Sequence, residues 1–146
     1  MKGTYCLLVQ LERDEDIEVG ALGVCKFRSG MYAYVGSALA GIEQRVGRHR
    51  GSRKRRRWHI DYLLERGEVV ATIAIPTQQK STECSVARSL LSSGEAKPIV
   101  PGFGSSDCGC PSHLVYFGDV DAELAAEAVS LTVSMLQNAY RRTVDD

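Results

Sequence analysis

The chain has 146 residues, of which 44% are hydrophobic, so it can bury one sizeable core but is short for two domains. No apolar run approaches the eighteen residues typical of a membrane-spanning helix, and the first residues lead into a strand-like segment instead of a signal peptide. We therefore expect a soluble, cytoplasmic protein with a single domain over residues 1–146 and no membrane partner.

The charges are balanced overall but unevenly distributed. Eighteen Lys and Arg residues match eighteen Asp and Glu residues, so the formal net charge is zero. Eight of the basic residues nevertheless lie between residues 45 and 57, a segment that contains no acidic residue. Such a run is either a solvated surface or the contact surface for an anionic partner. Its members are Arg45, Arg48, Arg50, Arg53, Lys54, Arg55, Arg56 and Arg57.

Strand-forming residues dominate the first part of the chain. Residues 5–11 form an apolar run typical of a strand, and the acidic segment 12–18 after it indicates an exposed loop. Two further strands are predicted over residues 20–27 and 31–36. The short connection between them ends in a glycine, which favours an antiparallel hairpin joined to the first strand.

Helical spacing follows these strands. Apolar residues recur every three or four positions over 39–49, which predicts a helix, and the same spacing over 58–66 predicts a second helix with Trp58 and Tyr62 facing inward. The β-branched segment 69–75, which ends at a proline, indicates a buried strand.

The remaining elements are a third helix, an irregular segment, a strand and a final helix. Ser81 or Thr82 can cap the third helix. Residues 98–111, rich in proline and glycine, predict irregular chain with tight turns. A strand over 113–117 and an amphipathic helix from about 121 to 140 complete the chain. The fold class predicted is α+β, with a small, mostly antiparallel sheet flanked by helices.

The segment from residue 30 to 49 is the most informative for chemistry. It comprises a strand that contains Tyr34, a turn of small residues, and a helix that carries Arg45 and His49. Arg45 and His49 are one helical turn apart, so both can project toward the same point. An arginine offers a planar set of donors for phosphate oxygens, and a nearby tyrosine hydroxyl can orient or deprotonate water. These residues indicate a phosphodiester site.

Two tripeptides resemble the signatures of the GIY-YIG nuclease superfamily: Gly3-Thr4-Tyr5, in which threonine replaces isoleucine, and Tyr34-Val35-Gly36. Arg45 lies eleven residues after Tyr34, where the family places its arginine, and His49 matches a histidine of several branches. Glu83 resembles the family's metal-binding carboxylate. The rest of the chain, a strand-helix extension, resembles a less characterised branch found alone or fused to endonuclease III-type repair proteins.

Two features depart from the usual pattern of that family or compete with it. The gap between the two tripeptides is longer than in most members. A rival alignment would use Gly30-Met31-Tyr32 as the first tripeptide, but Tyr32 and Tyr34 would then share one strand, whereas the family draws its tyrosines from two adjacent strands.

The resemblance implies hydrolysis of DNA or a related nucleic acid by a repair-type or structure-directed endonuclease. Glu83 would hold Mg²⁺ or Mn²⁺, Arg45 would stabilise the phosphate charge, and Tyr5 or Tyr34 would activate water, with His49 as a relay. A non-catalytic nucleic-acid-binding accessory module of the same fold is the alternative. The expected binding surface consists of Arg48, Arg50, Arg53, Lys54, Arg55, Arg56 and Arg57.

The chain contains five cysteines. An odd number argues against a framework in which every cysteine is paired in a disulfide, and it favours a reducing compartment. Cys84, Cys108, Cys110 and His113 have the donor types of a Cys₃His zinc site, provided that Cys84 folds back beside Cys108. A zinc- or thiol-dependent protein is therefore a second alternative. Two other interpretations stay open: the loop packs without metal, or Asp107 and His113 line the nuclease cleft together with Ser105 and Ser106.

Overall fold

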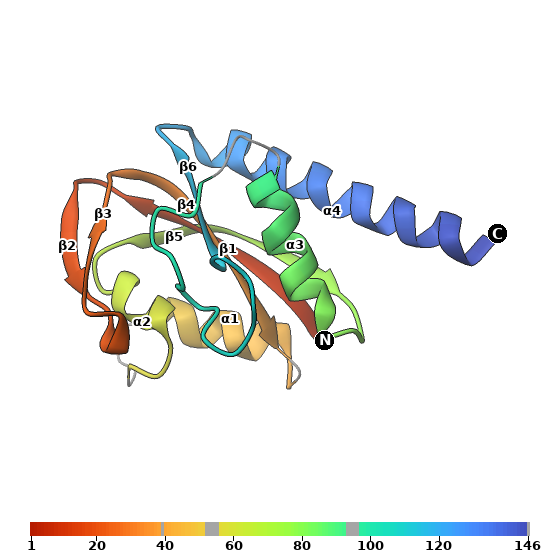
Figure 1. Ribbon diagram of the computed structural model, residues 1–146, viewed down its shortest axis with the longest axis horizontal. Helices are drawn as coiled ribbons and strands as arrows, with labels where there is room; N and C mark the ends of the chain where they lie inside the picture. Colours follow the sequence, from red (N-terminus) through yellow and green to blue (C-terminus); the bar gives the residue numbers. More distant parts are fainter. Residues whose placement is uncertain (39, 52–55, 93–96, 146) are drawn as a thin grey trace.

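The central element is a four-stranded antiparallel sheet with helices on both faces, as the predicted α+β class requires (Figure 1). The computed structural model describes residues 1–38, 40–51, 56–92 and 97–145. The strands lie in the order β5-β1-β4-β6, and each pairs antiparallel with its neighbours. Their bounds are Gly3–Leu11 for β1, Gly30–Ala38 for β4, Glu68–Pro76 for β5 and Leu114–Gly118 for β6.

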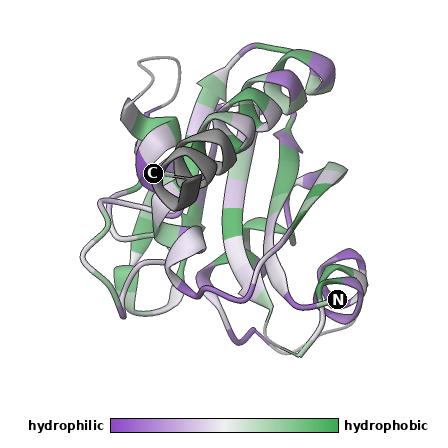
Figure 2. Ribbon diagram, turned by 90° about the vertical axis from the view of Figure 1, so that its right-hand side faces the viewer, coloured by the Kyte–Doolittle hydropathy of each residue, from purple (hydrophilic) through white to green (hydrophobic). Residues whose placement is uncertain are grey.

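The helices cover the two faces of this sheet in pairs. Helices α1 (Ile42–Arg50) and α2 (His59–Leu63) lie on one face, and α3 (Ser81–Ser92) and α4 (Ala122–Asp145) lie on the other (Figures 1 and 2). Because side chains alternate along a strand, β1 supplies both cores: Tyr5, Leu7, Val9 and Leu11 face the α1 and α2 side, and Cys6 and Leu8 face the α3 and α4 side.

The acidic segment that we predicted as a loop is partly a strand. Strands β2 (Glu15–Glu18) and β3 (Val24–Phe27) form a separate two-stranded sheet. The predicted hairpin between residues 20–27 and 31–36 was therefore wrong, because β1 and β6 already occupy both edges of β4 and β3 pairs with β2 instead. Burial of Ile17 shows that the acidic segment presents one apolar side chain inward while its charged neighbours stay near solvent.

Strand β5 was expected to be buried, and this prediction was also wrong. It is an edge strand of the sheet, so its side chains alternate between partly buried and exposed positions, and only Ile75 is fully buried. The β-branched composition reflects strand propensity and not burial.

The predicted helices are present with shifted ends. Helix α2 is shorter than expected, and its buried residues Ile60 and Leu63 anchor it, whereas Trp58 and Tyr62 are half-buried. Helix α4 begins after Asp121, close to the predicted start, and the Oδ1 of Asp121 accepts the Leu124 N–H at 2.9 Å and so caps the helix. No helix in the described part of the chain is both long and apolar enough to cross a membrane.

Candidate active site and a cysteine-histidine cluster

A cleft of about 530 Å³ lies on the α1 side of the sheet, close to the start of α3. Tyr5, Tyr34, Arg45 and Glu83, which come from β1, β4, α1 and α3, all line it. The structure thus brings together four of the five residues expected to be catalytic, although they are spread over nearly eighty positions of the sequence. Further lining residues are Ser37, Arg57, Trp58, His59, Lys80, Gly104, Ser106 and Asp107.

The two tyrosines lie on adjacent antiparallel strands, as expected from the chosen alignment. Tyr5 is directly opposite Gly36 across the β1–β4 pair, and the ring centroids of Tyr5 and Tyr34 are 6.4 Å apart. A Cβ atom at position 36 would stand 2.5 Å from the Tyr5 ring and hydroxyl, so the absence of a side chain at Gly36 is what lets Tyr5 pack across β4. Tyr32 instead donates its hydroxyl proton to the Arg28 carbonyl at 2.6 Å.

His49 is placed behind Tyr5 and does not line the cleft. It is 2% exposed, and its Nε2 lies 2.7 Å from the Tyr5 hydroxyl oxygen. Burial raises the pKa of Tyr5 above its ordinary value, although Arg45 acts in the opposite direction, and burial raises the pKa of Tyr34 as well. Both hydroxyls therefore stay protonated at neutral pH.

Arg45 is held in place from two directions. Its Nη1 donates to the Ser37 carbonyl at 3.1 Å, and its guanidinium carbon lies 4.4 Å from the centre of the Trp58 ring. A guanidinium stacked on an aromatic ring keeps donors in its plane free to meet a ligand. Trp58 thus orients an arginine of the cleft and also packs against the core, as its predicted inward orientation implies.

Arg48, which we expected on the nucleic-acid-binding surface, pairs with a buried acid and keeps 25% of its side-chain exposure. Its Nη1 and Nη2 donate to Oδ1 and Oδ2 of Asp61 at 2.9 and 3.1 Å, and Asp61 is 1% exposed. The same carboxylate accepts the backbone N–H groups of Arg57 and Trp58 at 2.7 and 2.9 Å. Asp61 therefore fixes the end of the basic run against α1.

The rest of the basic run has mixed surroundings. Arg50 is exposed, and Arg57 is exposed and lines the cleft. Arg56 is paired with Glu65, Nε to Oε2 at 2.9 Å. The three remaining members, Arg53, Lys54 and Arg55, lie outside the described residues.

Glu83 stands in the first turn of α3 with its carboxylate at the cleft. Its Oε1 lies 2.8 Å from Nδ1 of His113, which is 2% exposed. This is an ion-pair contact when His113 is protonated. Burial opposes a charged His113, but Glu83 outweighs it and raises the pKa of that imidazole. Lys80, one turn before Glu83, also lines the cleft and was missed by the sequence analysis.

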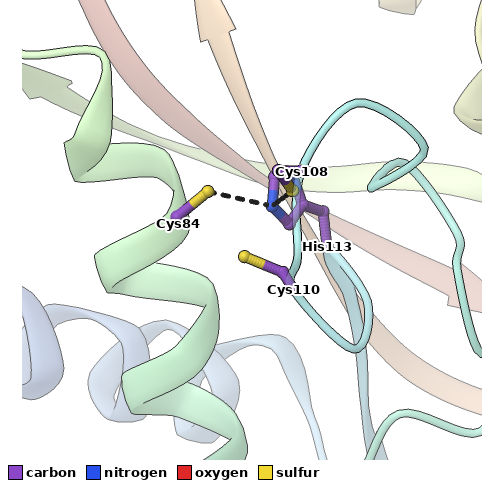
Figure 3. Close-up of side chains that lie close together, drawn as sticks. All are labelled: Cys84, Cys108, Cys110 and His113. Carbon is purple, nitrogen blue, oxygen red and sulfur yellow. Dashed lines mark hydrogen bonds between the residues drawn. The ribbon is translucent and has the colours of Figure 1, made fainter.

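The donor atoms of Cys84, Cys108, Cys110 and His113 all lie within 4.8 Å of one another. Cys84 comes from α3, and the other three come from the loop that precedes β6 (Figure 3). Cys84 thus folds back beside Cys108, as the zinc interpretation requires, and the cluster has the donors to bind a metal ion. Burial, together with the thiols of Cys110 and Cys108, raises the pKa of Cys84 to about 12.

The loop divides its residues between the two sites. Ser106 and Asp107 line the cleft, whereas Ser105 is buried and its carbonyl lies 3.7 Å from the Cys108 sulfur. Gly104 has a φ of +69°, and a Cβ atom there would stand 3.0 Å from the Tyr34 ring. A glycine is therefore needed where the loop backbone passes over Tyr34.

Comparison with known proteins identifies the family but gives no named relative. No curated protein and no solved structure matches the chain significantly. Residues 4–135 match the model of a family described as a domain of unknown function, DUF123. Because this match spans most of the chain, the protein belongs to the DUF123 family.

Proposed function

We propose that the cleft hydrolyses phosphodiester bonds of DNA or a related nucleic acid with the help of one divalent cation. The observation that carries the proposal is that Tyr5, Tyr34, Arg45 and Glu83 line one cleft from four separate elements. These are the residues, in the same order, that give the sequence its resemblance to the GIY-YIG nucleases.

The charges of the cleft suit a phosphate group. Arg45, Arg57 and Lys80 bring positive charge to its wall, and Glu83 and Asp107 bring negative charge. Carboxylates that face a phosphate repel it unless a cation lies between them. Mg²⁺ and Mn²⁺ accept one or two carboxylates and complete their shells with water and phosphate oxygens, so the donors fit such an ion, with Glu83 as its main protein ligand.

Each side chain then has a distinct role. The bound cation would neutralise charge on the scissile phosphate. Arg45, pre-oriented by Trp58, donates its in-plane N–H groups to a phosphate oxygen. The Tyr5 hydroxyl accepts a proton from the attacking water and gives its own hydroxyl proton to Nε2 of His49. This relay uses a neutral tyrosine, consistent with the raised pKa of Tyr5.

Nucleic acid would approach along the end of the basic run. Arg57 and Trp58 line the cleft, and Arg50 is exposed nearby on α1. Guanidinium contacts to phosphates give affinity that does not depend on base sequence. Duplex, nicked and branched substrates are therefore expected to bind, and the cleft selects the phosphate that is cut.

A non-catalytic binding module remains the second candidate, and one contact favours it. Glu83 already faces Nδ1 of His113 at 2.8 Å, and a carboxylate engaged by an imidazole is a weaker cation ligand. A carboxylate has two oxygens, however, so one oxygen of Glu83 can contact His113 while the other binds a cation.

A cleavage assay on plain, nicked and branched DNA, with Mg²⁺ or Mn²⁺ and with EDTA, separates the two candidates. The nuclease proposal predicts cutting that EDTA abolishes and that Arg45→Ala lowers by at least about a hundredfold, since a single charge-stabilising donor contributes about that much. Arg66→Ala is the matched control, because Arg66 is an exposed residue paired with Glu15 at 3.3 Å. DNA binding with no metal-dependent cutting would favour the binding module.

A further inference from the structure

We propose that Cys84, Cys108, Cys110 and His113 form a closed zinc site that is separate from the cation site of the cleft. The ion would join α3 to the loop before β6, two segments that are 29 residues apart between Cys84 and His113. The four donors lie together whether or not the cleft cuts nucleic acid.

The two sulfur–nitrogen distances from His113 match those of tetrahedral zinc. With Zn–S of about 2.3 Å and Zn–N of about 2.0–2.1 Å, an ideal tetrahedron separates a sulfur from a nitrogen by about 3.6 Å. Nε2 of His113 lies 3.7 Å from the Cys84 sulfur and 3.5 Å from the Cys108 sulfur. The Cys110 sulfur completes a set whose members are all within 4.8 Å of one another (Figure 3).

The donor types select the metal and its role. Three thiolates and one imidazole favour zinc over Mg²⁺ or Mn²⁺, which prefer oxygen ligands. Four protein ligands fill a tetrahedral shell and leave no position for water or substrate, which is the pattern of a structural site. Cys110 and His113 are buried, whereas Cys84 and Cys108 are partly exposed and leave a route for the ion.

His113 connects the proposed zinc site to the cleft, because it belongs to that site and contacts Glu83, which lines the cleft. If Nε2 binds zinc, the ring proton must sit on Nδ1, which faces Oε1 of Glu83 at 2.8 Å. A carboxylate that accepts the free N–H of a zinc-bound histidine orients the ring and strengthens its binding. The same loop supplies Gly104, Ser106 and Asp107 to the cleft wall. Zinc would thus hold the Glu83 carboxylate and the facing loop in position.

Metal analysis of the reduced, purified protein tests the site directly. We expect one zinc per chain, and we expect cobalt substitution to give the intense absorption of a tetrahedral, thiolate-rich site. Cys84→Ser and Cys108→Ser should lose stoichiometric zinc, whereas Cys25→Ser should keep it, because Cys25 lies outside the cluster. The cobalt spectrum of the unmodified protein keeps the test valid if a serine variant fails to fold.

The link to Glu83 is tested by zinc affinity, measured by competition with a chelator. Glu83→Gln should keep one zinc per chain but bind it about ten- to a hundredfold more weakly, the usual effect of losing such a carboxylate. An unchanged affinity would remove the link. A reduced protein that takes up no zinc, or a cobalt complex without thiolate absorption, would overturn the site. None of these measurements uses DNA cleavage, so their failure is distinct from failure of the nuclease proposal.

Discussion

Removal of the Asp61 carboxylate should destabilise the protein far more than removal of an exposed acid. Asp61 accepts two hydrogen bonds from Arg48 and two from backbone N–H groups, and it is 1% exposed. Loss of one partner of a buried ion pair costs about 3–5 kcal/mol. Because the Arg48 side chain keeps 25% of its exposure, water can partly solvate the charge left behind, and we expect about 3 kcal/mol for Asp61→Ala.

Urea unfolding measures this free energy, and Glu65→Ala is the matched control. Glu65 pairs with Arg56 on the surface, with side-chain exposures of 46% and 57%, so its removal should cost less than about 1 kcal/mol. Equal, small losses for the two variants would refute the assignment of Asp61 as the anchor of the basic run.

The pH dependence of stability provides a second check on Asp61. Burial alone would raise its pKa, but the hydrogen bonds from Arg48 and from the backbone of Trp58 and Arg57 lower it overall. Because the folded pKa is below the unfolded value of about 3.9, the stabilisation is fully present above that value and is lost as the pH falls through the folded pKa. The free-energy difference between the unmodified protein and Asp61→Asn should therefore shrink below about pH 4.

Two further pairs of variants test the packing of the tyrosines and the basic surface. Gly36→Ala should cost about 1–3 kcal/mol and reduce cleavage, because its Cβ atom would stand 2.5 Å from Tyr5. Gly47→Ala, compared with it by thermal unfolding, should be neutral or stabilising by up to about 1 kcal/mol. The added Cβ atom would meet no atom within 4 Å beyond its chain neighbours and its own helix backbone. Arg57→Ala should lower the slope of log affinity for DNA against log salt by about 1, whereas Arg56→Ala should change it less because Glu65 already pairs with Arg56. Equal destabilisation by Gly36→Ala and Gly47→Ala would contradict the packing assignment. Identical salt slopes of DNA affinity for Arg57→Ala and Arg56→Ala would contradict the assignment of the basic surface.

The sequence was sufficient for most elements but not for strand pairing. Periodicity placed α1, α3 and α4, because the side chains that face the core recur at helical spacing. Pairing depends on which strand edges are already occupied, and nothing local in residues 12–27 shows that β6, which begins at Leu114, takes the second edge of β4. The wrong prediction for β5 has a similar cause, because a β-branched run has the same composition in a buried central strand and in an edge strand.

The site residues were predictable where a motif ordered them. Tyr5, Tyr34, Arg45 and Glu83 were expected to share a cleft, and the structure places them in one. The pairing of Arg48 with Asp61 was not predictable, because the sequence does not show that Asp61 is buried beside α1. Lys80 was overlooked, although its position just before the helix of Glu83 was a usable signal. The cysteine cluster depended on the fold, because only a packed α3 brings Cys84 to the loop.

Single-turnover cleavage of bound DNA by Glu83→Gln, with zinc content determined on the same samples, shows whether the Glu83 carboxylate takes part in cutting. Glu65→Gln is the control, since it changes an acid paired with Arg56 on the surface. We predict that Glu83→Gln binds DNA as well as the unmodified protein, still carries zinc, and cuts at least about a hundredfold more slowly, a loss of about 2.7 kcal/mol, in Mg²⁺ and in Mn²⁺. Metal-dependent cutting by Glu83→Gln at the rate of the Glu65→Gln control would contradict this prediction.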